Sequence, residues 1–225
     1  MKKITMSLLL ALCFASLASA ELLVTANPLG QGKMAFAGAY VLDSNYQNST
    51  GLTLGTIGGY FGYGITDKLD TYLQYGQGTA GGTIPTGIGG MSGTGYGASL
   101  KYTILDEGVS MPVSVALGGG YKSFSNKVTI TGLGDITSTS SQMMIGVGVS
   151  KIMAPFVPYG AIAYRSTNVS TANSNSTQLD LTVGTAIAWS MQGAVMIEYS
   201  MQSITPQAGS SYTGGEIAAS VAYRL

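Results

Sequence analysis

Residues 59–76 read GYFGYGITDKLDTYLQYG, and this stretch restricts the possible folds more than any other part of the chain. In its second half, one row of alternate side chains is mostly apolar and the other is mostly polar: Leu69, Thr71, Leu73 and Tyr75 against Asp70, Tyr72, Gln74 and Gly76. Residues 66–68 separate the two halves with side chains that favour a tight turn. The stretch therefore predicts a β-hairpin with one face toward lipid and the other toward a wet interior, as in a transmembrane β-barrel.

The rest of the chain repeats this unit. After residue 20 no window of about 18 consecutive apolar residues remains, so no segment is expected to cross a bilayer as a helix. We predict ten strands instead, at residues 34–43, 52–65, 69–76, 93–105, 109–122, 141–153, 157–167, 178–190, 194–203 and 214–225. Longer polar connections alternate with short turns, and they lie at residues 44–51, 77–92, 123–139, 168–177 and 204–213.

This order of connections predicts the fold class. We expect an all-β, transmembrane, antiparallel up-and-down β-barrel of ten strands, with short periplasmic turns and longer extracellular loops. The even strand number places both termini on the side of the turns and pairs the first strand with the last. A soluble β-sandwich is the alternative, because its strands alternate in the same way, although it does not require every second connection to be short.

Aromatic side chains favour the barrel. Those expected near the loop ends of their strands are Tyr40, Tyr75, Tyr96, Tyr121 and Tyr164, and those expected near the turn ends are Tyr63, Tyr102, Trp189 and Tyr223. Two such groups are typical of the aromatic girdles at the two surfaces of a membrane.

The first 20 residues read as an export signal, so we expect one barrel domain at residues 21–225. Lys2 and Lys3 precede a mostly apolar run, and the small residues 18–20 form a typical cleavage site. The run is too short for the roughly 20 residues of a spanning helix. Lipidation of Cys13 is a weaker alternative, because Leu12 stands where a small residue is expected.

Cleavage would remove two of the ten basic residues and none of the ten acidic ones, which leaves eight against ten and a net charge of −2. Only 9% of the residues are charged, whereas soluble domains carry about 25%. No basic patch stands out, so we expect no nucleic-acid partner.

The 59–76 hairpin, the export signal and the final GGEIAASVAYRL resemble small outer-membrane β-barrel proteins of Gram-negative bacteria, the porin-like class. The resemblance covers the whole mature chain and implies a location in the cell outer membrane. It also implies outer-membrane lipid and lipopolysaccharide as surroundings, and the barrel assembly machinery as a partner during insertion. The last strand of that class usually ends in Phe or Trp, whereas this one ends in Leu225. The sequence predicts no oligomeric state.

Composition limits the chemistry that the chain can perform. It has no His, and its one Cys is Cys13, so Ser-His-Asp triads, cysteine nucleophiles and histidine metal sites are excluded in the mature protein. Two carboxylate pairs, at residues 67 and 70 and at residues 106 and 107, lie in or beside turns, where a turn role is expected. We expect no enzyme activity, no cofactor and no metal site.

If the apolar rows face lipid, seven charged side chains point into the lumen: Asp70, Lys101, Arg165, Asp180, Glu198, Glu216 and Arg224. Arg165 and Asp180 lie at similar distances from the centre of one loop, so we expect them to meet across that hairpin. The group forms either a constriction lined by both signs or a network of ion pairs that fixes the barrel. Small barrels are usually filled by side chains, which favours the network. Glycines on the inferred inner face fill little space and favour an opening: Gly95, Gly97, Gly118, Gly120, Gly146, Gly148 and Gly184.

Two functions from different classes fit these features. The first is a porin-like barrel that forms at most a narrow pore for water, ions or small solutes. The alternative is a non-conducting structural or surface-interaction barrel, similar to an adhesin, whose extracellular loops bind partners. The loops are rich in Gly, Ser, Thr and Asn, which leaves both functions open.

Overall fold

The computed structural model describes residues 25–44, 51–84, 86–108, 111–170, 174–207 and 210–225. Within them the chain forms ten strands: β1 (Met34–Ser44), β2 (Leu52–Gly64), β3 (Leu69–Gly82), β4 (Ile88–Leu105), β5 (Ser114–Ile130), β6 (Gly134–Ser150), β7 (Phe156–Val169), β8 (Ser174–Ala188), β9 (Gly193–Pro206) and β10 (Tyr212–Arg224). This described part holds no helix that is long and apolar enough to span a membrane. The export signal predicted at residues 1–20 lies outside the described residues.

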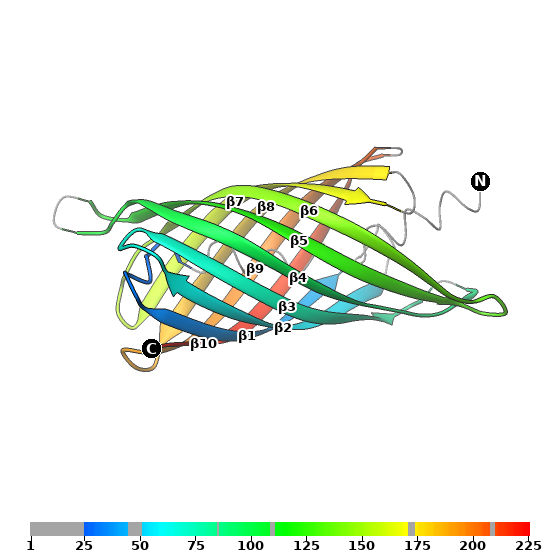
Figure 1. The fold of residues 1–225 in the computed structure, drawn as a ribbon, viewed down its shortest axis with the longest axis horizontal. Helices are drawn as coiled ribbons and strands as arrows, with labels where there is room; N and C mark the ends of the chain where they lie inside the picture. Colours follow the sequence, from blue (N-terminus) through cyan, green and yellow to red (C-terminus); the bar gives the residue numbers. More distant parts are fainter. Residues whose placement is uncertain (1–24, 45–50, 85, 109–110, 171–173, 208–209) are drawn as a thin grey trace.

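The strands form one closed antiparallel barrel in which each strand pairs with its neighbours in sequence (Figure 1). Strand β1 pairs with β10 from Ala35 opposite Arg224 to Ser44 opposite Gly215, which closes the wall. The predicted fold class is confirmed, and the sandwich alternative is wrong. The C-terminus lies at the same end as the β2–β3 connection, on the left of Figure 1. We call this end the turn end and the opposite end the loop end.

The outer surface carries the apolar rows and the aromatic side chains. All nine aromatic residues assigned to the two girdles are exposed on the outside, from Tyr63 at 37% to Tyr96 at 67%. Leucine, isoleucine, valine and methionine side chains lie between them, for example Leu100, Ile145 and Val183. A wall with this exterior is matched to the hydrocarbon region of a bilayer.

Strand β5 shows that the alternation reverses toward the loop end. In its turn-side half, the exposed apolar side chains Leu117 and Tyr121 face outward. Farther along, Phe124 and Val128 are buried inside, and Lys127 is exposed outside. A wall that has left the bilayer meets water outside, so apolar side chains become stable only on its inner face. The loop end of the barrel therefore carries apolar side chains inside and polar side chains outside, as a soluble protein does.

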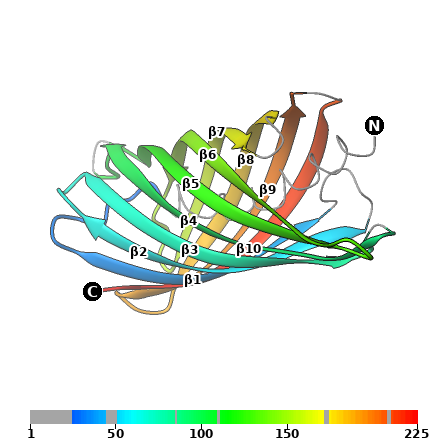
Figure 2. The ribbon, with the colours of Figure 1, turned by 45° about the vertical axis from the view of Figure 1, so that its right-hand side comes forward.

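Two predicted loops are mostly strand. The sequence predicts long loops at residues 77–92 and 123–139, but β3 continues to Gly82, β4 begins at Ile88, and only residues 131–133 join β5 to β6. These extensions carry Gly, Ser and Thr on the outside and their apolar side chains on the inside. The alternation expected of a lipid-facing strand, with apolar side chains outside, therefore does not detect them. Figures 1 and 2 show the β3–β4 and β5–β6 hairpins reaching far out at the loop end.

The fifth strand also begins later than predicted. The alternation predicts a start at residue 109, but β5 begins at Ser114. Pro112 has no backbone N–H for a ladder, and reciprocal backbone hydrogen bonds between Gly108 and Met111 close a turn before it. Residues 109 and 110 themselves lie outside the described residues.

The topology predicts which positions are reachable from outside the cell. We expect a membrane-impermeant maleimide to label Leu133→Cys on intact cells, because residue 133 is 78% exposed at the tip of the β5–β6 hairpin. Met191→Cys is the matched control: residue 191 is 100% exposed in the β8–β9 turn and should be labelled only after the outer membrane is permeabilised. Labelling of residue 191 on intact cells would reverse the orientation.

Candidate functional site

The interior of the barrel contains three layers between the loop end and the turn end. The loop-end cluster consists of the buried apolar residues Leu52, Leu54, Met91, Phe124, Val128, Ile130, Val169 and Ile204. The charged belt consists of the buried residues Asp43, Lys122, Arg165, Asp180, Glu198 and Glu216. The N-terminal segment, residues 25–33, precedes β1 and occupies the turn end.

An ion pair between β7 and β8 is central to the charged belt. Arg165 Nε lies 2.7 Å from Asp180 Oδ2, and each side chain is only 1% exposed. The expected meeting of these two residues across the hairpin is confirmed. Asp180 also accepts a hydrogen bond from Gln178 Nε2 at 2.6 Å, so the carboxylate is held from two sides.

Neighbouring strands extend the charged belt. Gln202 Nε2 donates to Glu216 Oε2 at 3.0 Å, and Glu216 lies opposite Asp43 where β10 meets β1. The hydroxyl of Tyr159 donates to Glu198 Oε2 at 2.8 Å. These bonds fix the acidic side chains in place, as buried carboxylates require.

Two members of the charged belt are absent from the sequence prediction. Asp43 and Lys122 are both buried, and each directly follows an outward apolar neighbour, Leu42 or Tyr121. The alternation therefore contained the signal. Both residues are the last of a predicted strand, at residues 34–43 and 109–122, so the prediction assigns them no inward partner.

The inner glycines make room for large side chains. A Cβ at Gly184 would lie 2.6 Å from the ring of Tyr159, and a Cβ at Gly97 would lie 2.7 Å from Lys122 Cγ. At these two positions the glycine row gives room to a large neighbouring side chain. It does not by itself create an open channel.

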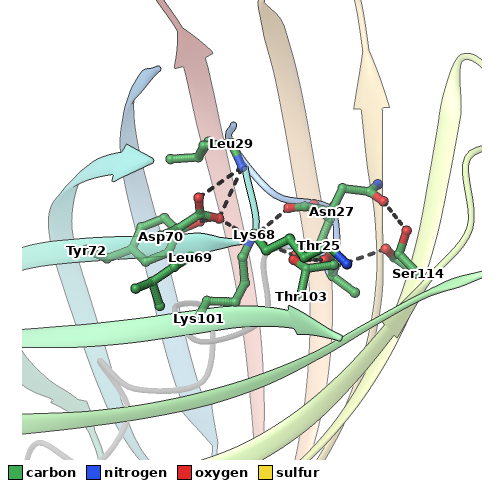
Figure 3. Close-up of polar contacts among 12 residues, drawn as sticks. Thr25, Asn27, Leu29, Lys68, Leu69, Asp70, Tyr72, Lys101, Thr103 and Ser114 are labelled. Carbon is green, nitrogen blue, oxygen red and sulfur yellow. Dashed lines mark hydrogen bonds and ion pairs between the residues drawn. The ribbon is translucent and has the colours of Figure 1, made fainter. Parts of the chain in front are cut away.

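The N-terminal segment is held in the turn end by Asp70 and Lys101 (Figure 3). These two side chains form an ion pair, with Lys101 Nζ 3.3 Å from Asp70 Oδ2. Lys101 Nζ also donates to the carbonyl oxygens of Thr25 at 3.1 Å and Asn27 at 2.7 Å. The carboxylate of Asp70 accepts from the backbone N–H of Leu29 at 3.1 and 3.2 Å. One buried ion pair therefore binds the backbone of the segment in two ways: Lys101 donates to its carbonyl groups, and Asp70 accepts from its N–H group.

Hydroxyl groups of the wall complete this docking. Thr103 Oγ1 donates to the carbonyl of Ala26 at 2.9 Å, and Ala26 N–H donates to Ser150 Oγ at 3.0 Å. Ser114 Oγ donates to Asn27 Oδ1 at 2.5 Å. Sequence patterns gave no sign of this arrangement, because a short irregular segment has no periodicity.

The structure places the seven predicted lumen residues in three locations. Asp70 and Lys101 hold the N-terminal segment, whereas Arg165, Asp180, Glu198 and Glu216 belong to the charged belt. Arg224 keeps the inward parity of β10 but ends that strand, so its side chain is exposed at the mouth of the turn end. Among the described residues, no group of three or more acidic, His or Cys side chains is placed to hold a metal ion.

Comparisons with known proteins concern the fold. No protein-family model and no curated protein sequence matches the chain. The transport unit of the autotransporter AIDA-I from Escherichia coli is 10% identical, with a TM-score of 0.52 over 98% of this chain and 96% of that one. Neisserial surface protein A is 18% identical, with a TM-score of 0.46 over 86% and 97%. The β-barrel domain of Pseudomonas aeruginosa OprF is 12% identical, with a TM-score of 0.43 over 87% and 99%.

The closed wall agrees with the fold of the AIDA-I transport unit. The chain is a closed β-barrel whose exterior suits a membrane, which agrees with a location in the cell outer membrane.

The buried ion pair predicts a stability effect. Asp180→Ala should lower the free energy of unfolding by about 3 to 5 kcal/mol, because the Arg165 guanidinium loses its carboxylate in a confined interior. The double variant Arg165→Met/Asp180→Leu should recover most of that loss. Urea unfolding in lipid vesicles measures both.

The pair between Lys127 and Asp135 is the matched control. Its atoms are 2.6 Å apart, but the side chains are 50% and 46% exposed. Asp135→Ala should therefore lower the free energy of unfolding far less than Asp180→Ala does, because water screens the exposed pair. Additive losses in the double variant of Arg165 and Asp180 would contradict the coupling.

The loop-end cluster predicts a second effect. Phe124→Ala should cost about 3 to 5 kcal/mol, because Phe124 is 2% exposed and its removal leaves a cavity among apolar side chains. Ser125→Ala, one residue along on the outer face, should change stability by less than about 0.5 kcal/mol. Equal effects in the same unfolding measurement would show that the cluster is not a packed core.

Proposed function

We propose that the protein is a non-conducting outer-membrane barrel that presents its loop-end hairpins at the cell surface, without an enzymatic role. The observation that carries this proposal is the loop-end cluster. It joins side chains from β2, β4, β5, β7 and β9 inside a single closed wall. An ion or a water chain that enters from outside meets this apolar layer first.

The physical cost of crossing the loop-end cluster supports the proposal. A hydrated ion that enters an apolar layer loses its water without gaining polar partners, which is strongly unfavourable. Five partly buried hydrophobic residues pack against the cluster and thicken it: Ala80, Ile84, Ile88, Ile136 and Tyr212.

Two further layers lie in series with the loop-end cluster. The charged belt is built from side chains that bond to one another across strands, as Arg165 does with Asp180. The N-terminal segment then fills part of the turn end through Lys101 and Asp70. A porin-like pore, the other function open from the sequence, requires a path through all three layers.

The outer face of the loop end supports a role in surface contact. Its outward positions are hydroxyl, amide and charged side chains, such as Ser125, Thr137 and Asn168, and the Lys127–Asp135 pair lies among them. A partner would be bound mainly by hydrogen bonds to this polar surface.

The insertion partners belong to the same proposal. The outward row of β10 consists of Ile217, Ala219, Val221 and Tyr223, followed by Leu225, and most of it is apolar. We propose that the barrel assembly machinery recognises this strand, and that lipopolysaccharide and outer-membrane lipid surround the finished wall.

Planar-bilayer recordings test the central point. The refolded mature protein should give no unitary conductance steps at either polarity, because the loop-end cluster offers no wetted path. A Leu133→Cys variant labelled after insertion into vesicles proves that silence does not come from failed insertion. Reproducible steps of one size from a correctly inserted protein would favour the narrow pore instead.

A further inference from the structure

A cavity of about 410 Å³ lies inside the turn end of the barrel. Strands β1, β8, β9 and β10 supply much of its wall, and the N-terminal segment contributes Thr25, Asn27 and Leu29. No member of the charged belt lines it. The cavity therefore lies between the N-terminal segment and the wall, apart from the charged belt and the loop-end cluster.

The cavity exists because four neighbouring strands place alanine at one inward level. Ala188 pairs with Ala194, Ala194 with Ala222, and Ala222 with Ala37, so the row crosses β8, β9, β10 and β1 without interruption. Each alanine adds a single methyl group to the wall and leaves the space in front of it unfilled. At the level of the charged belt, by contrast, long polar side chains fill the lumen.

The part of the lining around the alanine row is apolar. Ala35, Val157, Ala186 and Met196 extend the apolar wall around the alanine row. Apolar cavities bind apolar ligands in preference to water, and pockets of about 300 to 1,000 Å³ are the usual size for small molecules. At the lower part of that range, one hydrocarbon chain fits better than the two chains of a phospholipid.

Charge adds a second constraint. Two of the described residues that line the cavity are charged, and both are cationic: Lys101 and Arg224. Lys101 is committed to Asp70 and to the N-terminal carbonyl groups. The Arg224 side chain is exposed at the mouth, beside Gly30, and is not paired with an acidic side chain of the described residues. A guanidinium in this position suits a carboxylate, which it can bind through two parallel hydrogen bonds.

We propose that this cavity binds a single-chain carboxylate amphiphile of the fatty-acid type. Its hydrocarbon chain lies along the alanine row, and its carboxylate is held at the turn-end mouth by Arg224. The ligand enters from the side of the turns, which faces the periplasm. This site does not depend on whether the barrel conducts, because it lies beyond the loop-end cluster.

The one tryptophan of the chain provides the readout. The Trp189 ring lies against Gly193, which lines the cavity. Terminally brominated dodecanoate added to the mature protein in lipid nanodiscs should quench Trp189 fluorescence in a saturable manner, above the linear quenching from probe dissolved in the bilayer. Unbrominated dodecanoate should compete with it, and dodecyltrimethylammonium should not.

Matched variants separate the cavity from the lipid. Ala222→Leu fills the cavity and should abolish the saturable component. Ala219→Leu makes the same change on the outer face of β10 and should keep it. Ala37→Leu serves as a second filling variant, and the shift in gel mobility on heating checks that each barrel is folded. Arg224→Gln should weaken binding about tenfold, since it removes the charged partner of the carboxylate.

Three results would overturn the proposal. The first is purely linear quenching of the wild-type protein. The second is saturable quenching that survives in both folded filling variants. The third is equal competition by the cationic amphiphile together with unchanged affinity in Arg224→Gln, which would remove the carboxylate from the site.

Discussion

The rest of the structure depends on one constraint: a backbone N–H or C=O group that faces lipid must be paired within the protein. The ten strands meet this constraint because β1 and β10 pair along ten positions and leave no open edge. Closure then fixes the other features. Every strand has one face toward the membrane and one toward the lumen. The start of β1 and the end of β10 meet at the turn end. The inner face is therefore a shared interior that ten separate strands must fill together.

How that interior is filled follows from the solvent outside. Across the bilayer the apolar row is held outward by lipid, so the inner row receives polar side chains such as Arg165 and Asp180, which must pair. Where the wall leaves the bilayer, water outside and a closed space inside reverse the preference, and Phe124 and Leu54 turn inward to form a packed core. At the turn end, the N-terminal segment and an alanine-lined cavity replace long side chains.

Local pattern predicts a large part of this arrangement. Alternation identifies the strands and the inward parity of Asp70, Lys101, Arg165, Asp180, Glu198 and Glu216, all of which are buried. It fails where the apolar side chains change from the outer face to the inner face. The extensions of β3 to β6 were predicted as loops because their outward residues are polar, and Asp43 and Lys122 were missed because they lie at that boundary. Pro112 has the opposite effect: it fits the alternation, so the predicted strand begins too early, but it has no N–H group for the ladder.

The sequence by itself determined the number of strands, the faces that side chains take across the membrane and the kind of solvent outside the wall. These properties are local, because parity along a strand needs only neighbouring residues. Only the tertiary structure decided which segments meet inside when they are not joined by one hairpin. The alanine row joins residues 37, 188, 194 and 222, and residues 25–29 find Asp70 and Lys101, because register and closure bring distant segments to the same level. Such contacts depend on how ten strands are staggered around one axis, which no single stretch of sequence encodes.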